Sequence, residues 1–112
     1  MGTPAAGSVV LVPFPFSDLS QARRRPAVVL ADAGRGDWIL CQVTSKPYAD
    51  VSAIELADND FERGGLQLTS YARPAKLFTA HESLFVFEAG VLRAASLKRI
   101  ADRVVAVIQR NA

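Results

Sequence analysis

Short apolar runs, separated by polar segments with Gly and Pro, occupy most of the chain, a pattern typical of β-strands joined by turns. The first run, Val9–Phe16, is rich in β-branched and aromatic residues and therefore predicts a strand buried on both faces. Pro13 and Pro15 cannot donate a ladder hydrogen bond, so this strand is expected to be irregular, or to lie at a sheet edge, from that point on.

A β-hairpin is the next element that the pattern predicts. Pro26–Ala31 and Trp38–Thr44 are apolar runs, and the glycines of Ala33–Asp37 between them predict a turn. The polar segments Ser17–Arg24 and Ser45–Asp50 are expected to be loops. The other short strands are expected at Val51–Leu56, Leu66–Ala72, Lys76–Thr79 and Leu84–Glu88, with one helical turn at Asn59–Arg63.

The last segment changes to the i, i+3, i+4 spacing of an amphipathic helix. Its apolar positions are Leu97, Ile100, Ala101, Val104, Val105 and Ile108. Ser96 is the expected N-cap. Several short strands and one terminal helix predict a mainly β fold with α, a small barrel or sandwich that carries a helix. We expect a single domain over residues 1–112, with a flexible N-terminus at residues 1–7.

Composition narrows the possible functions. No run of eighteen or more apolar residues is present, so we expect no membrane span. The absence of a signal-peptide pattern at the N-terminus predicts a cytoplasmic protein. The single cysteine, Cys41, and the single histidine, His81, lie forty positions apart, and we expect neither a metal site nor a cofactor. Cys41 lies in an apolar strand and is expected in the core.

Positive charge gives a weak indication of nucleic-acid binding. Lys and Arg number 13 against 11 Asp and Glu, for a formal charge of +2 and a pI near 9.0. Most of the cations are Arg, and Arg23, Arg24 and Arg25 are consecutive. The planar guanidinium can bind a phosphate through two hydrogen bonds. A solubilising surface explains a generic Arg-rich patch equally simply.

These residue types suit one reaction well. RNA carries its own nucleophile, the 2′-hydroxyl, so cleavage requires only removal of a proton, stabilisation of the phosphorane oxygens and departure of the 5′ oxygen. An Arg and a hydroxyl fixed at strand ends can supply the stabilising part.

Several segments in their order resemble the PemK/MazF toxins. They are Val9–Phe16, the block Arg25-Pro-Ala-Val-Val-Leu30, the strand end Val43-Thr44-Ser45, the segment Tyr71–Thr79 and the terminal helix. The resemblance implies an SH3-like small barrel of the CcdB/PemK type that forms a homodimer. It also implies a toxin of a type II toxin–antitoxin system that cleaves single-stranded mRNA selectively and without a metal. The expected products carry a 2′,3′-cyclic phosphate and a 5′-hydroxyl.

Matching the motifs assigns roles to residues. Arg25, before the Pro, is implied to be catalytic, and Thr44, at the strand end, is its implied partner. The candidate RNA-binding residues are Arg23, Arg24, Ser45, Lys46, Arg73 and Lys76. Arg73 could instead pair with Glu82 or another carboxylate.

The motif match does not assign the residue that acts as the general base. Some members carry Glu-Gln-Ala in the first loop, where this chain has Ser20-Gln21-Ala22. Asp18 and Ser20 are the candidates, or Arg25 and Thr44 act without a carboxylate.

Two other functions fit the same fold: a gyrase poison like CcdB, and a nucleic-acid-binding barrel without chemistry. The expected partner is an antitoxin with an acidic, disordered segment that masks Arg25, in a complex that also binds DNA. Trp38, Phe85 and Phe87 could stack on nucleobases, but their alternating strand positions favour the core or an interface.

Overall fold

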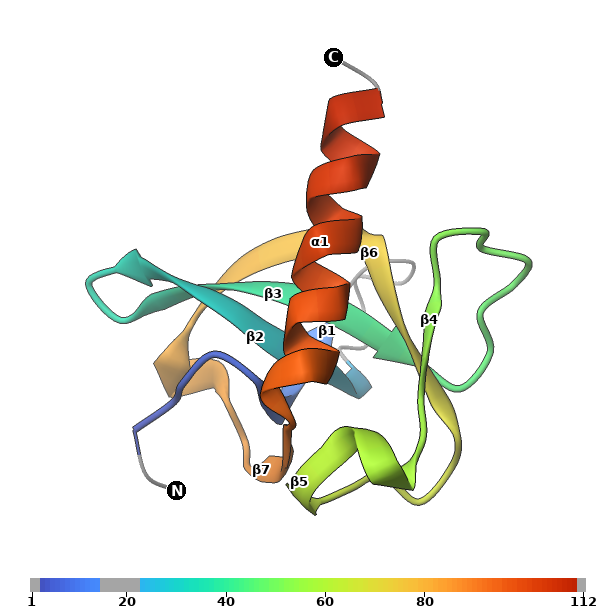
Figure 1. The fold of residues 1–112 in the computed structure, drawn as a ribbon. Helices are drawn as coiled ribbons and strands as arrows, with labels where there is room; N and C mark the ends of the chain where they lie inside the picture. Colours follow the sequence, from blue (N-terminus) through green and yellow to red (C-terminus); the bar gives the residue numbers. More distant parts are fainter. Residues whose placement is uncertain (1–2, 15–22, 111–112) are drawn as a thin grey trace.

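A strongly curved antiparallel sheet and a C-terminal helix make up the part of the chain that the computed structural model describes, residues 3–14 and 23–110 (Figure 1). The strands are β1 (Ser8–Phe14), β2 (Arg23–Gly34), β3 (Asp37–Thr44), β4 (Ile54–Leu56), β5 (Phe61–Gly64), β6 (Ser70–His81) and β7 (Glu88–Leu92). Two 3-10 turns, η1 (Asp58–Asp60) and η2 (Glu82–Leu84), and the helix α1 (Ala94–Arg110) complete these elements. The strand order β4-β6-β3-β2-β1-β7-β5 confirms the mainly β fold with a terminal helix.

Both faces of the sheet are covered, which explains the continuous apolar runs. Val9 and Val28 belong to a core cluster on the face that includes Ile100 of α1, whereas the neighbouring Val10 and Val29 belong to a second cluster that Phe85 completes. The prediction of a strand buried on both faces is confirmed for this part of β1. Cys41 is fully buried in the first cluster, as expected.

The predicted hairpin is β2–β3, and Gly34, Arg35 and Gly36 all have positive φ at its turn. β2 is longer than the prediction because it begins at Arg23, which moves Arg23 and Arg24 out of the predicted loop and into a ladder with β1. The rest of that loop, residues 17–22, lies outside the described residues. Pro13 pairs with Arg24 of β2, but the ladder between β1 and β7 has already ended at this point. β1 is therefore a local sheet edge on that side, where a proline without an N–H donor is tolerated.

The prediction of two strands at Leu66–Ala72 and Lys76–Thr79 is wrong. A single long strand, β6, runs from Ser70 to His81, and residues 66–69 are not part of it. Ala72 pairs with Val43 and Leu77 pairs with Cys41, so the residues between them bulge opposite Gln42. This bulge accommodates Pro74, which indicates a strand break when the sequence is considered alone.

The strand predicted at Leu84–Glu88 is also wrong, since η2 occupies its start and β7 begins only at Glu88. The backbone nevertheless pairs with β1 locally, because Val86 N donates to Leu11 O and Leu11 N donates to Phe87 O. Irregular pairing leaves Phe85 in the core and Phe87 half-exposed.

The segment between β3 and β5 has less regular structure than the pattern predicts. Only Ile54–Leu56 of the predicted strand Val51–Leu56 forms β4, which pairs with β6. The predicted helical turn is displaced toward the N-terminus, to η1, and Phe61 already begins β5.

The helix α1 begins at Ala94, so Ser96 is not its N-cap. Leu97 N donates to Arg93 O, and Ser96 Oγ donates to Asp60 Oδ1 at 2.8 Å instead of capping the backbone. The first half of α1 packs on the sheet through Ile100, whereas its second half extends beyond the sheet (Figure 1). No helix in the described ranges has the length and apolar content needed to cross a membrane.

Candidate active site

A groove lies where β2 begins and β3 ends, beside the segment that precedes β6. Its cavity volume is about 540 Å³. The lining residues are Leu11, Arg24, Arg25, Pro26, Val43, Thr44, Ser45, Gly65, Leu66, Gln67, Leu68, Ser70, Phe87 and Ala89. Four of the predicted site residues, Arg24, Arg25, Thr44 and Ser45, therefore share one groove.

Arg25 and Thr44 line the same groove, just beyond the last residue pair of the β2–β3 ladder. Ala27 lies opposite Gln42 in the β2–β3 ladder, and continuing this antiparallel register by two residues places Arg25 opposite Thr44. Side chains directly opposite each other in such a ladder have Cβ atoms about 4.5–5.5 Å apart. Arg25 is also paired with Val12 of β1, so its backbone is fixed on a regular ladder.

The Thr44 hydroxyl is held by the next turn of the chain. It accepts a hydrogen bond from Lys46 N at 3.1 Å and lies 3.2 Å from Lys46 O, to which it can donate. Thr44 Oγ1 is thus oriented at the end of β3 before any ligand arrives. Donation to a phosphate oxygen requires the Thr44 proton to turn away from Lys46 O, while the hydroxyl oxygen can continue to accept from Lys46 N.

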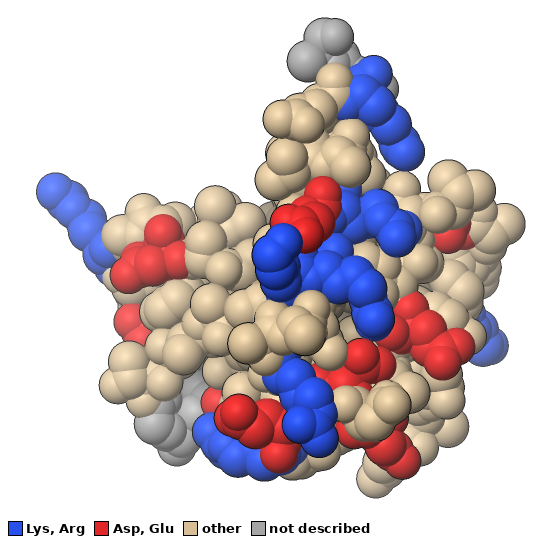
Figure 2. Space-filling model, in the orientation of Figure 1, with Lys and Arg blue, Asp and Glu red and all other residues tan. Residues whose placement is uncertain are grey.

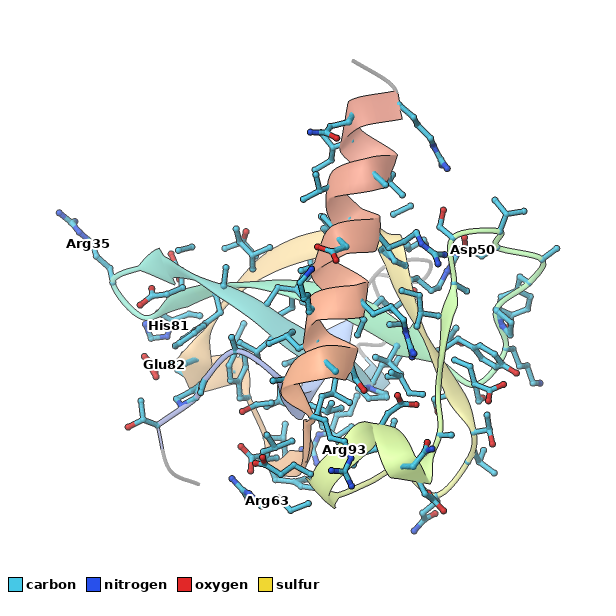
Figure 3. All side chains as sticks on the ribbon, in the orientation of Figure 1. Arg35, Asp50, Arg63, His81, Glu82 and Arg93 are labelled. Atoms are coloured by element: carbon cyan, nitrogen blue, oxygen red, sulfur yellow. The ribbon has the colours of Figure 1, made fainter. Side chains whose placement is uncertain are left out.

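Arg73 does not line the groove. Its Nε atom lies 2.8 Å from Asp50 Oδ2, and its Nη1 atom donates to Gln42 Oε1 at 3.3 Å. The side chains of Arg73 and Asp50 are only 19% and 11% exposed. Of the two alternatives that the sequence left for Arg73, the structure shows the ion pair, and its partner is Asp50 on the β3–β4 loop. Figure 3 shows Asp50 and Glu82 on opposite sides of the molecule.

The ion pair with Arg73 favours the negatively charged form of Asp50. The hydrogen bond from Arg73 lowers the pKa of Asp50, burial raises it, and a hydrogen bond from Ser52 N lowers it further, so that the pKa lies below its ordinary value. Lys46 and Lys76 are exposed and are not among the groove-lining residues.

Apolar residues line the same groove as the arginines. They are Leu11, Leu66, Leu68 and Phe87, of which the sequence analysis considered only Phe87 as a ligand-binding residue. Leu66-Gln-Leu68 alternates apolar and polar residues and therefore resembles a strand. Phe87 is 49% exposed, so its aromatic side chain lies partly outside the core.

The structure leaves the general base undetermined. Asp18 and Ser20, the two candidates, lie outside the described residues. Among the described residues that line the groove, no Asp, Glu or His is present. The described part of the groove thus supplies donors for a phosphate, from Arg24, Arg25 and Thr44, and an apolar surface.

Charges elsewhere are largely neutralised by their neighbours. On the face seen in Figure 2, Lys and Arg side chains gather over α1 and are interleaved with Asp and Glu side chains. Lys98 pairs with Asp102 at 2.7 Å and Arg99 pairs with Asp60 at 3.3 Å. A second, shallow cavity of about 460 Å³ beside α1 contains Asp60, Arg99 and Arg103, and its charges are mixed rather than basic.

Cys41 and His81 do not belong to the groove. Burial raises the pKa of the Cys41 thiol to about 12, so the thiolate that a nucleophile requires does not form near neutral pH. His81 Nδ1 contacts Ser83 at the start of η2, close to the β2–β3 turn (Figure 3). Within the described residues, no three side chains of the His, Cys, Asp and Glu types come together to hold a metal ion.

The fold and sequence are similar to those of known toxins. Residues 5–108 match the family described as PemK-like, MazF-like toxin of type II toxin-antitoxin system. MazF (Form-I) from Deinococcus radiodurans superposes with a TM-score of 0.72 at 21% identity, over 97% of this chain and 99% of that one. The MazE–MazF complex (Form-III) from the same organism gives a TM-score of 0.74 at 20% identity, over 95% and 96%.

A mycobacterial endoribonuclease in complex with its cognate antitoxin gives a TM-score of 0.72 at 13% identity, over 97% of this chain and 96% of that one. No curated protein sequence matches the chain. The structural matches confirm the expected CcdB/PemK-type fold, and the family match covers nearly the whole chain. The chain belongs to the PemK-like, MazF-like toxins of type II toxin–antitoxin systems.

Proposed function

We propose that this toxin is an endoribonuclease that cleaves single-stranded mRNA in the groove, without a metal ion, and so arrests translation in the cytoplasm. The observation that carries the proposal is the convergence of Arg24, Arg25 and Thr44 on one groove of about 540 Å³. A cavity of this size, with cationic donors at one end, accommodates a nucleotide segment rather than a duplex.

The proposed reaction uses the RNA as its own nucleophile. The 2′ oxygen attacks the adjacent phosphorus while its proton passes to a base, and the bond from phosphorus to the 5′ oxygen breaks as that oxygen takes up a proton. The products are a 2′,3′-cyclic phosphate and a 5′-hydroxyl. Negative charge grows on the non-bridging oxygens in the transition state, so donors directed at them lower the barrier.

Arg25 is assigned to this stabilisation. Its guanidinium stays protonated and can donate two parallel hydrogen bonds to phosphate oxygens, which a Lys cannot do. Thr44 Oγ1 is assigned to the same phosphate group, and Arg24 and Ser45 to neighbouring backbone phosphates.

The proposed protein partner is an antitoxin with an acidic segment that lies in the groove and masks Arg25. The arginines and apolar residues that line the groove together suit a segment that combines carboxylates with apolar side chains, and such a segment can fold on binding. We also propose that the toxin acts as a homodimer, which light scattering of the purified protein tests.

The test is cleavage of a long mixed-sequence RNA in the presence of EDTA, with mapping of the 5′ ends. Wild type is expected to cut at a limited set of sites. Arg25→Ala is expected to reduce kcat by about 100- to 1,000-fold, the usual effect of losing one preorganised donor, and Arg25→Lys is expected to recover only part of it.

Arg35→Ala is the matched control, because Arg35 is an exposed arginine at the tip of the β2–β3 turn and points away from the body (Figure 3). It is expected to behave like wild type. Cleavage that requires an added metal, or full activity of Arg25→Ala, contradicts the proposal. Intact RNA together with gyrase-dependent DNA breaks indicates a gyrase poison instead.

A further inference from the structure

The groove is amphipathic in a way that phosphate binding alone does not explain. Arg24 and Arg25 line it together with Leu11, Leu68 and Phe87. Leu68 is 66% exposed and Phe87 is 49% exposed. Single exposed apolar residues are normal on a protein surface, but here several converge on one concave site beside positive charge.

The arginines among these apolar residues select the ligand. A purely apolar ligand would leave Arg24 and Arg25 without an anionic partner in the groove, whereas an unpaired nucleotide satisfies both kinds of lining residue. Its phosphate is an anion, and its base is a flat ring whose faces prefer an aromatic or aliphatic surface to water.

Phe87 is held in place before a ligand binds. Leu11 N donates to Phe87 O at 3.0 Å, and Val86 N donates to Leu11 O at 2.8 Å, so the backbone on both sides of the side chain is fixed to β1. The next residue, Glu88, pairs with Arg63 at 2.9 Å and accepts a hydrogen bond from Ser8 Oγ at 3.1 Å. A rigidly mounted ring loses little conformational entropy when a base stacks on it.

We propose that Phe87, with Leu68 beside it, forms a base-binding subsite, on which the base of a nucleotide next to the phosphate bound by Arg25 stacks. This inference rests on the proposed function, because it concerns how the same groove binds RNA. The subsite contributes to substrate affinity, and Phe87 is a binding residue rather than a residue that acts on the phosphate.

The kinetic test compares Phe87→Ala with Val86→Ala. Stacking on an aromatic side chain is lost in Phe87→Ala, so KM is expected to rise between about 5- and 150-fold while kcat changes little. Val86 is the matched control, since it is 40% exposed, adjacent in sequence and absent from the groove lining. Phe87→Trp is expected to keep the wild-type KM, and Phe87→Leu, which retains an apolar side chain but no aromatic ring, is expected to lose much of the affinity.

A second experiment identifies the nucleotide whose base stacks on Phe87. Oligoribonucleotides with an abasic residue at successive positions around the cut site retain every phosphate and lose one base at a time. Wild type is expected to show a raised KM for an abasic residue at one position, and Phe87→Ala is expected to be insensitive at that position. Far-UV circular dichroism and thermal melting confirm that each variant is folded.

The outcomes separate the two proposals. If wild type neither cleaves nor binds RNA, the proposed function and this inference both fail. If wild type cleaves RNA and Phe87→Ala keeps both the wild-type KM and the wild-type sensitivity to the abasic position, the base-binding subsite is refuted and the nuclease stands. If Phe87→Ala leaves the RNA kinetics unchanged but weakens binding of the antitoxin, Phe87 binds a protein segment rather than a base, and the inference is equally refuted.

Discussion

Replacement of Asp50 by Asn tests the ion pair that holds the β3–β4 loop against β6. The substitution retains the size of the side chain but removes the negative charge. Arg73 Nε and Ser52 N donate to different oxygens of Asp50, and Asn has only one oxygen, so only one of the two hydrogen bonds can be kept. Arg73, only 19% exposed, then keeps its positive charge beside a neutral amide. Its one other side-chain acceptor in the described structure, Gln42 Oε1 at 3.3 Å, is neutral as well.

The magnitude follows from the burial of the pair. Breaking a fully buried pair costs about 3–5 kcal/mol, whereas an exposed pair contributes about 0–1 kcal/mol. The side chains of this pair are 11% and 19% exposed, so the pair lies between these limits, and we expect a loss of about 2 kcal/mol. For a chain of 112 residues this corresponds to a fall in Tm of about 8 °C.

The assay is urea unfolding at a series of pH values, with Asp102→Asn as the control. Asp102 pairs with Lys98 on the surface, where the two side chains are 65% and 75% exposed, so its replacement is expected to cost less than about 1 kcal/mol. Asp50 has a lowered pKa in the folded state, so the unfolded state binds more protons at acid pH. The stability difference between wild type and Asp50→Asn is therefore expected to be constant above the unfolded pKa of about 3.9 and to shrink as the pH falls through the folded pKa.

Two results would refute this reasoning. One is a loss in Asp50→Asn as small as that in Asp102→Asn. The other is a stability difference that stays constant to the lowest pH at which the protein folds, since it would show that the carboxylate charge is not what stabilises Arg73. Asp60 also has a lowered pKa, because the hydrogen bonds it accepts outweigh its burial, but it is present in both proteins and cancels in the comparison.

Two further predictions concern the fold around the groove. Gly64 has φ +68°, and a Cβ there would lie 2.4 Å from Ala89 O, whereas Gly34 has φ +96° with open space around it. Gly64→Ala is expected to destabilise the protein by about 1–3 kcal/mol more than Gly34→Ala in urea unfolding, and equal effects would contradict the close packing of β5 on β7. Cys41 is buried with its pKa raised to about 12, so a maleimide at pH 8 is expected to label it only at the rate of unfolding, and rapid labelling of the folded protein would contradict its burial.

Local patterns were sufficient for the hairpin, whereas Arg25 and Thr44 were indicated by the family resemblance. The glycines at residues 34 and 36 determine the turn. Two register shifts in β2, between Val29 and Ala31 and between Asp32 and Gly34, then change the register on the way to Arg25, and the sequence did not predict them. Tertiary structure decided the rest. Pro74 indicates a strand break in sequence, yet a bulge opposite Gln42 keeps β6 continuous.

Contacts between side chains far apart in the sequence were the feature least predictable from the sequence. Serine is a residue type that is common at N-caps, but Ser96 instead donates its hydroxyl hydrogen bond to the carboxylate of Asp60, which is far away in the sequence. Arg73 pairs with Asp50, which lies in a loop, rather than with Glu82, which follows the same strand. Such choices depend on which side chains the packed sheet brings within reach, and sequence separation carries no information about that.

The groove draws its residues from distant parts of the chain. Leu11, Arg24, Arg25 and Thr44 are made early, whereas Phe87 and Ala89 follow only after β6. Because synthesis proceeds from the N-terminus, a nascent chain released before Phe87 carries the arginines without the proposed base-binding ring. On the proposed function, truncated products of interrupted translation are therefore expected to bind RNA more weakly than the complete toxin.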